Sequence, residues 1–255
     1  MYILFLFLSC RSIPDAPKSL DLLGSYIFEN FDQENPQYLQ QGVSNLDTWV
    51  SENREAVLEG YRIENLSQGA ISELGMPDDT VLEDLLGAAV ATDVQNTLDV
   101  FLPTILKTDP MELSPDAYGY FHQDWNGDID CFLQKECDLL TYIAEGLLLF
   151  PLGLEIESTV SGQFRWVHVD DMSYVVQRRW MMEPGQSNKD WMQIDQDYAL
   201  AIFIPMSDGL RIVDLEWVVT YLGDMPVPED FVLGLAIEAM QDSRTDVDSY
   251  IDQSQ

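Results

Sequence analysis

Between residues 139 and 223, apolar and polar side chains alternate over long stretches of the chain. Alternation with a period of two is typical of β-strands that bury one face. We predict five consecutive strands here, at about 139–150, 153–169, 172–183, 190–205 and 209–223. Short polar turns at 169–172 and 207–209 join neighbouring strands, and such turns favour antiparallel hairpins. The chain is therefore expected to fold around one antiparallel sheet.

The segment before the sheet shows helical periodicity instead. Apolar residues recur there at intervals of three or four, at Leu20, Leu23, Ile27 and Phe31. A second helix is predicted from Pro36, a residue favoured in the first helical turn, to about Leu58. We interpret residues 20–60 as a helical hairpin that packs on the rest, and residues 61–255 as the main domain.

The main domain contains further elements before and after the five strands. The earlier ones are a buried strand, a helix and a strand, at about 86–92, 94–106 and 117–122. After two prolines, Glu229 and Asp230 open a C-terminal helix that extends to about Ile251. The predicted order is therefore strand, helices, a run of antiparallel strands, and one long final helix.

This order resembles the helix-grip fold of the START/SRPBCC superfamily, in which a curved antiparallel sheet wraps around a long C-terminal helix. The resemblance rests on the aromatic hairpin Phe164–Trp180, the hairpin Ile202–Tyr221 and the helix after Pro228. It covers residues from about 85 to 253 and implies an α+β fold, here preceded by the helical hairpin. It also implies a deep apolar cavity between the sheet and the C-terminal helix, which holds lipids, sterols or other hydrophobic small molecules.

Large side chains on the stripe interpreted as inward-facing are the candidate ligand contacts. They are Trp166, Arg178, Trp180, Tyr198 and Trp217. The same stripe is equally compatible with a filled core, because aromatic side chains also dominate ordinary interiors. Arg178 is the informative member, since a buried guanidinium requires a partner. That partner is a protein carboxylate, an anionic group of a ligand, or water at the rim.

The N-terminus combines an apolar run at residues 2–8 with Ser9 and Cys10. The run is too short to span a bilayer, which takes about 20 residues, but it fits the apolar part of a secretory signal peptide. Ser9–Cys10 resembles the processing site of bacterial lipoproteins, which implies lipidation of Cys10 and a place in the cell envelope, on the periplasmic or surface side. Residues 1–9 are then the signal peptide, and residues 10–19 the lipidated cysteine with its tether. A buried N-terminal strand is the alternative.

The two other cysteines, Cys131 and Cys137, remain as a pair if Cys10 carries lipid. They lie six positions apart in a polar stretch, and a disulfide between them is expected outside the cytosol. Two unrelated thiols or a metal-binding pair are the alternatives. The chain has no second pair of cysteines or histidines to complete a zinc site, which disfavours the metal.

The charge balance limits the partners of this chain. Twelve Lys and Arg stand against 45 Asp and Glu, for a formal net charge of −33. A surface this negative repels nucleic-acid phosphates and anionic lipid head groups, so neither is expected as a direct partner. It suits a saline environment, where salt screens the self-repulsion.

No catalytic motif stands out, and neither a cofactor nor a metal is expected. The stretch 124–130 alternates oxygen-bearing side chains but departs from an EF-hand loop, so we interpret it as a polar turn. The chain has only two histidines, His122 and His168, and His168 is expected to be exposed and paired with Asp170 or Asp171.

We therefore predict a membrane-anchored lipoprotein that binds or carries a hydrophobic small molecule or lipid. The first alternative is a structural or interaction lipoprotein with a filled core and an acidic surface that binds a protein partner. The second alternative is an enzyme built on the same fold, with His168 or an acidic residue as the base.

Overall fold

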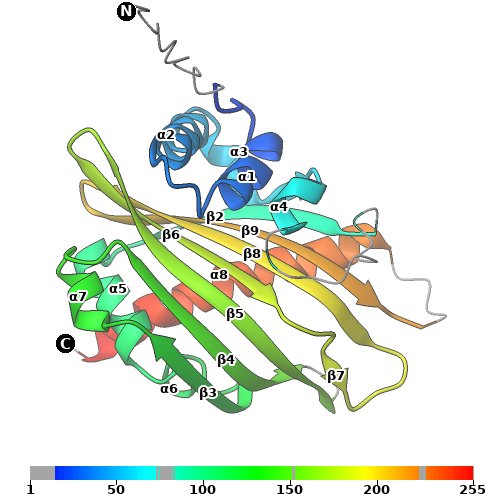
Figure 1. Ribbon diagram of the computed structural model, residues 1–255. Coiled ribbons are helices and arrows are strands. Elements are labelled where there is room, and N and C mark those ends of the chain that lie inside the picture. The colour runs from blue at the N-terminus through cyan, green and yellow to red at the C-terminus, as the bar shows by residue number, and fades with distance from the viewer. Residues whose placement is uncertain are drawn as a thin grey trace, which may run out of the picture.

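The computed structural model describes residues 15–72, 74, 82, 84–150, 153–223 and 228–254. Cys10 and the predicted signal peptide lie outside the described residues. Figure 1 shows one curved sheet with helices on both of its faces. The elements are α1 (Leu20–Glu29), α2 (Gln37–Glu52), α3 (Arg54–Glu59), β1 (Tyr61–Ile63), α4 (Gln68–Ser72), β2 (Leu86–Val94), α5 (Leu98–Lys107), α6 (Pro110–Leu113), β3 (Tyr118–Asn126), α7 (Ile129–Leu133), β4 (Leu139–Phe150), β5 (Leu154–Val169), β6 (Met172–Met181), β7 (Gln186–Ser187), β8 (Gln193–Met206), β9 (Gly209–Tyr221) and α8 (Glu229–Ser254).

The described strands form a single sheet in the order β1-β2-β9-β8-β6-β5-β4-β3, with β7 paired to β5. Every neighbouring pair is antiparallel. The five strands expected from alternation are β4, β5, β6, β8 and β9, and their bounds lie close to the predicted ones. The long helix α8 runs along the concave face (Figure 1), so the predicted helix-grip fold is confirmed.

The N-terminal helices cover the outer face of the sheet, opposite α8 (Figure 1). Gly24 lets α1 approach β9 closely, because a Cβ atom there would lie only 2.6 Å from Cδ2 of Leu215. The outer-face cluster of buried side chains includes Leu23, Ile27, Phe28, Val43, Leu46, Val176, Tyr198, Leu200, Ile202, Val213, Leu215 and Trp217. The helical hairpin is therefore part of the core of the molecule.

A second buried cluster lies on the concave face, where α5, α7 and the C-terminal end of α8 pack on the sheet. It includes Leu98, Phe101, Leu102, Phe132, Leu140, Tyr142, Phe164, Trp166, Val175, Phe203, Ile212, Val247 and Ile251. Only Val247 and Ile251 of α8 are buried. The C-terminal end of α8 is thus packed into a core, whereas residues 229–246 are at most partly buried. None of the described helices is long and apolar enough to cross a membrane.

Cys131 and Cys137 form a disulfide, as predicted, with their Cα atoms 5.4 Å apart. The bond joins α7 to the segment that enters β4. Asp128 is the N-cap of α7 and accepts hydrogen bonds from the backbone N–H groups of Asp130 and Cys131. The stretch 124–130 therefore ends β3 and begins a helix. The described residues contain no group of side chains that could hold a metal ion.

Removing this disulfide is expected to lower the free energy of unfolding by about 2 kcal/mol, because the bond closes a loop of only seven residues and so restricts the unfolded chain modestly. The measurement is urea unfolding of the wild type and of the Cys131→Ser/Cys137→Ser variant. Dithiothreitol should destabilise the wild type by the same amount and leave the double variant unchanged. Equal stability of the oxidised wild type and the double variant would contradict this expectation.

Candidate ligand-binding site

The five predicted ligand contacts do not share one face of the sheet. Arg178, Trp180, Tyr198 and Trp217 lie on the outer face, beneath the N-terminal helices. Trp166 lies on the concave face with α8 and donates a hydrogen bond from Nε1 to the carbonyl of Phe132 in α7. The expectation of one inward stripe made of all five residues is therefore wrong.

The error comes from the turn between β5 and β6. Asp170 and Asp171 form a two-residue loop, and the flanking residues Val169 and Met172 pair directly. An even-numbered residue of β5 is then opposite an odd-numbered residue of β6, and cross-strand partners share a face. Trp166 consequently shares its face with Val175 and Arg179 rather than with Arg178.

Arg178 is enclosed between the sheet and α1, with 2% of its side chain exposed. It donates hydrogen bonds to the Phe28 carbonyl at 3.0 Å and to Oε1 of Gln163 at 2.6 Å, and it forms an ion pair with Asp32. Its guanidinium lies 4.6 Å from the centre of the Phe31 ring. Of the three partners considered for Arg178, the structure shows the protein carboxylate.

The concave face carries a set of polar residues that sequence reasoning missed. This interior polar cluster consists of Tyr142 from β4, Gln177 and Arg179 from β6, Asp197 from β8, Asp214 and Glu216 from β9, and Arg244 from α8. Arg244 bonds Asp214 through two nitrogens, at 2.6 and 3.1 Å. Arg179 bonds Asp197 at 3.0 Å and lies 3.6 Å from Glu216. The pair of Arg244 and Asp214 joins α8 to β9, and the pair of Arg179 and Asp197 joins β6 to β8.

Glu216 is the carboxyl group of the cluster whose negative charge is least balanced by a neighbouring guanidinium. Its pKa is raised to about 8, chiefly because burial disfavours the charged form and secondly because the Asp197 carboxylate repels it, while Arg179 acts in the opposite direction. Burial also raises the pKa of Tyr142, whose hydroxyl accepts a hydrogen bond from Gln177 at 3.1 Å. The cluster therefore holds an acid that is largely protonated at neutral pH.

Solvent still reaches part of the cluster. The exposed fraction of the side chain is 35% for Arg179 and 22% for Glu216, against 8% for Asp214. Neighbouring apolar residues on the same face, such as Val160 and Val218, are also only partly buried. The concave face is thus close-packed near Val247 and incompletely packed toward the N-terminal half of α8.

The N-terminal half of α8 is rich in apolar side chains after its first two residues. Its large apolar members are Phe231, Val232, Leu233, Leu235, Ile237 and Met240, and none of them is buried. Phe231 and Leu235 are 58% and 51% exposed. A helix this apolar normally lies inside a core or against lipid, so residues 231–240 present apolar surface that the protein itself does not fully cover.

Two sequence signals pointed to the interior polar cluster. Asp214 and Glu216 alternate with Val213, Leu215 and Trp217, so they share the face of the strand opposite to Trp217. Arg244 is the only basic residue between 229 and 254, in a helix whose partner face on the sheet carries acids. An acidic stripe matched by a single base is typical of ion pairs across a packed interface.

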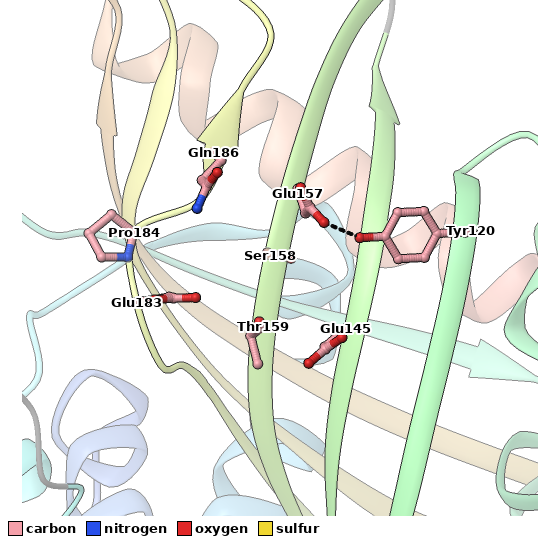
Figure 2. A pocket seen from close by; sticks show the side chains of 8 residues that line it. All are labelled: Tyr120, Glu145, Glu157, Ser158, Thr159, Glu183, Pro184 and Gln186. Carbon is pink, nitrogen blue, oxygen red and sulfur yellow. Dashed lines mark hydrogen bonds between the residues drawn. The ribbon is translucent and has the colours of Figure 1, made fainter.

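A pocket of about 210 Å³ lies on the outer face, beyond the N-terminal helices. Figure 2 shows the side chains of Glu145, Glu157 and Glu183 around it, with Tyr120 hydrogen-bonded to Glu157. The pocket is acidic and shallow, and the described side chains around it include no base. It adds to the negative outer surface and has no apolar walls that would suit a hydrophobic ligand.

Neither histidine belongs to a site among the described residues. His168 is exposed, as predicted, but its Nδ1 lies 3.0 Å from Oγ of Ser173 rather than beside an aspartate. His122 is exposed and lies 3.3 Å from Asp124. The position of both rings on the surface gives no support to an acid–base role.

Comparison with known proteins identifies similar folds and shows no closer relationship. No protein-family model and no curated protein matches the chain. A STAR-related lipid transfer protein from Xanthomonas axonopodis shares 9% identity over 68% of this chain and 96% of its own, with a TM-score of 0.43. The human StarD13 lipid transfer and protein localization domain shares 9% identity over 81% and 95%, with a TM-score of 0.44. Truncated norcoclaurine synthase from Thalictrum flavum shares 14% identity over 67% and 95%, with a TM-score of 0.41.

These solved structures have START-like architectures, in agreement with the resemblance inferred from the order of elements. At such identities the likeness is one of fold. With TM-scores below 0.5 it carries no argument about what this chain binds.

Proposed function

We propose that this protein binds or carries a hydrophobic small molecule or lipid between the concave face of the sheet and the N-terminal half of α8. The observation that carries the proposal is the state of residues 231–240, which are largely apolar and run along the sheet, with none of their large apolar side chains buried. Burial of apolar surface yields roughly 25 cal/mol per Å². An apolar ligand chain that covers this helix would be bound with this favourable free energy, and its binding would stabilise the folded protein.

The direct test is native mass spectrometry of the protein purified from its own host, followed by organic extraction of any bound molecule. We expect a stoichiometric hydrophobic molecule. A protein that is empty, and that also ignores a panel of fluorescent lipids, would overturn the proposal and favour the interaction protein with a filled core.

A matched pair of alanines in α8 locates the binding surface. Ala236 lies eleven residues before buried Val247, almost three helical turns, and so points in nearly the same direction. Ala239 is exposed. Ala236→Trp is expected to weaken uptake of a fluorescent lipid at least tenfold, because the indole occupies the space of the ligand, whereas Ala239→Trp leaves uptake unchanged. Equal effects of the two substitutions would contradict this location.

We further propose that the protein is a lipoprotein of the bacterial cell envelope, anchored to the membrane through Cys10. The apolar run followed by Ser9–Cys10 supports this proposal, as does the disulfide, which is typical of oxidising compartments. Cys10→Ser is expected to move the protein from the membrane fraction to the soluble fraction of its host. Unchanged fractionation would show that the anchor is wrong and leave the ligand proposal standing.

A further inference from the structure

The interior polar cluster contains three carboxyl groups and two guanidinium groups. Arg179 bonds Asp197, and Arg244 bonds Asp214 through two nitrogens, so both guanidinium groups have a primary carboxylate partner. Glu216 is the third carboxyl group, and the nitrogen of Arg179 is 3.6 Å from its nearer oxygen. If all three carboxyl groups were ionised, the cluster would have one negative charge in excess. A lone negative charge in such poorly hydrated surroundings is costly.

The excess charge is neutralised by a proton. Burial and repulsion by the Asp197 carboxylate raise the pKa of Glu216 to about 8, which favours the protonated form of Glu216 at neutral pH. Oδ1 of Asp197 is shielded from solvent and has no hydrogen-bond partner among the described residues. The proton on Glu216 thus stands where the cluster lacks a cation.

We propose that the ligand is an amphiphile with a cationic head group, a primary ammonium on an apolar chain, and that the ammonium replaces the proton on Glu216. This inference rests on the proposed function and names its ligand class. The ammonium donates hydrogen bonds to Glu216 and Asp197, the displaced proton passes to solvent, and the apolar chain lies against residues 231–240 of α8. A ligand carboxylate would add an uncompensated negative charge at the same place and is therefore disfavoured.

The geometry favours an organic cation over a metal ion. The described residues contain no group of three or more side chains suited to hold a metal. Arg179 also stands within 3.0 Å of Asp197 and repels a compact dication. An ammonium needs only two or three acceptors, and its single charge balances the cluster.

The exchange of a proton for an ammonium makes binding depend on pH. The charged groups that act on Glu216 are Asp197 from β8, Arg179 from β6 and Asp214 from its own strand. Tyr118 from β3 and Tyr142 from β4 lie near Arg179, and Arg244 from α8 lies beside Asp214. The arginines stay charged across the accessible range. The affinity for an alkylammonium should therefore rise up to tenfold per pH unit toward about pH 8, where Glu216 titrates, and then level off.

The test compares three twelve-carbon probes on the whole protein by calorimetry at pH 7 in moderate salt: dodecylammonium, dodecan-1-ol and dodecanoate. We expect dodecylammonium to bind at least tenfold more tightly than the alcohol, and dodecanoate to bind most weakly. Titrations in buffers of different ionisation enthalpy should show that close to one proton is released for each ammonium bound.

Glu216→Gln and Glu145→Gln form the matched pair of variants. Glu145 is exposed on the outer face, so its replacement removes a carboxyl group far from α8. Glu216→Gln should abolish the preference for the ammonium and the proton release, and leave the affinity for the alcohol unchanged. Glu145→Gln should bind all three probes like the wild type. This control tests whether the overall negative charge of the protein, rather than Glu216, attracts the cation.

The outcomes separate the two proposals. If none of the probes binds, the proposed function fails and this inference fails with it. If the alcohol or dodecanoate binds as tightly as dodecylammonium, the protein binds hydrophobic molecules but the cationic head group is wrong. If Glu145→Gln weakens ammonium binding as much as Glu216→Gln, the preference is a property of the surface charge and the assigned site is wrong.

Discussion

Glu216→Gln is expected to raise the free energy of unfolding at pH 8.5 by about 3–5 kcal/mol and to leave it nearly unchanged near pH 4. The pKa of Glu216 lies near 8 in the folded protein, mainly because of burial, and near 4.5 in an unfolded chain. Between these values the folded state binds more protons than the unfolded state. The contribution of Glu216 to stability therefore falls as the pH rises from about 4.5 to 8. Glutamine keeps the shape and a hydrogen-bond donor for Asp197 without the ionisation.

The measurement is urea unfolding of the wild type and the variant at pH 4.5, 6, 7 and 8.5 at constant ionic strength. The difference between the two proteins isolates Glu216 and its immediate neighbours, because the substitution leaves the distant acidic residues unchanged. Glu145→Gln serves as the control, and its difference from the wild type should stay within about 0.5 kcal/mol at every pH, because the side chain is exposed. A difference for Glu216→Gln that does not grow with pH would refute the assigned proton on Glu216.

Arg178→Met is expected to lower the free energy of unfolding by about 3 kcal/mol. Methionine fills much of the volume but leaves the Phe28 carbonyl and the Gln163 side chain without their donor, and it removes the cation from the Phe31 ring. Asp32 contributes less to the loss, because 41% of its side chain is exposed and water replaces its partner. The loss should be independent of any ligand, since Arg178 lies on the face opposite α8.

Arg165→Met is the matched control for this substitution. Arg165 lies on the adjacent strand and donates a hydrogen bond to the Phe31 carbonyl, but it is only partly buried and forms no ion pair among the described residues. We expect it to cost about 1 kcal/mol. Urea unfolding that gives the two variants the same stability would contradict the role assigned to Arg178.

The strands were predictable because one face of each is strongly apolar. The alternation of Val213, Leu215 and Trp217 with the polar residues Asp214 and Glu216 predicts a strand directly. The very short strands β1 and β7 were not predicted, since two or three residues carry no periodic signal and depend on their partners. The disulfide followed from the count and spacing of cysteines.

The candidate site was not predictable from the same pattern. Alternation states which residues share a face of one strand, but only the register of the hairpin relates that face to the next strand. The two-residue loop at Asp170 and Asp171 contained this information, and it places Arg179, not Arg178, beside Trp166. The pattern of β9 alone also does not reveal that Arg244 of α8 bonds Asp214 on the second face.

The pairing of β2 with β9 has a consequence for the order in which the protein assembles. These strands are separated by nearly half of the chain, yet they lie side by side next to the short edge strand β1, and α1 packs on residues of β8 and β9. During synthesis the apolar faces of the first helices stay uncovered until β8 and β9, the last two strands, have been made. Contacts this distant in sequence make folding slow and leave incomplete chains prone to association. A chain emerging from the ribosome or from an export channel would therefore depend on chaperones until residue 221 has been released.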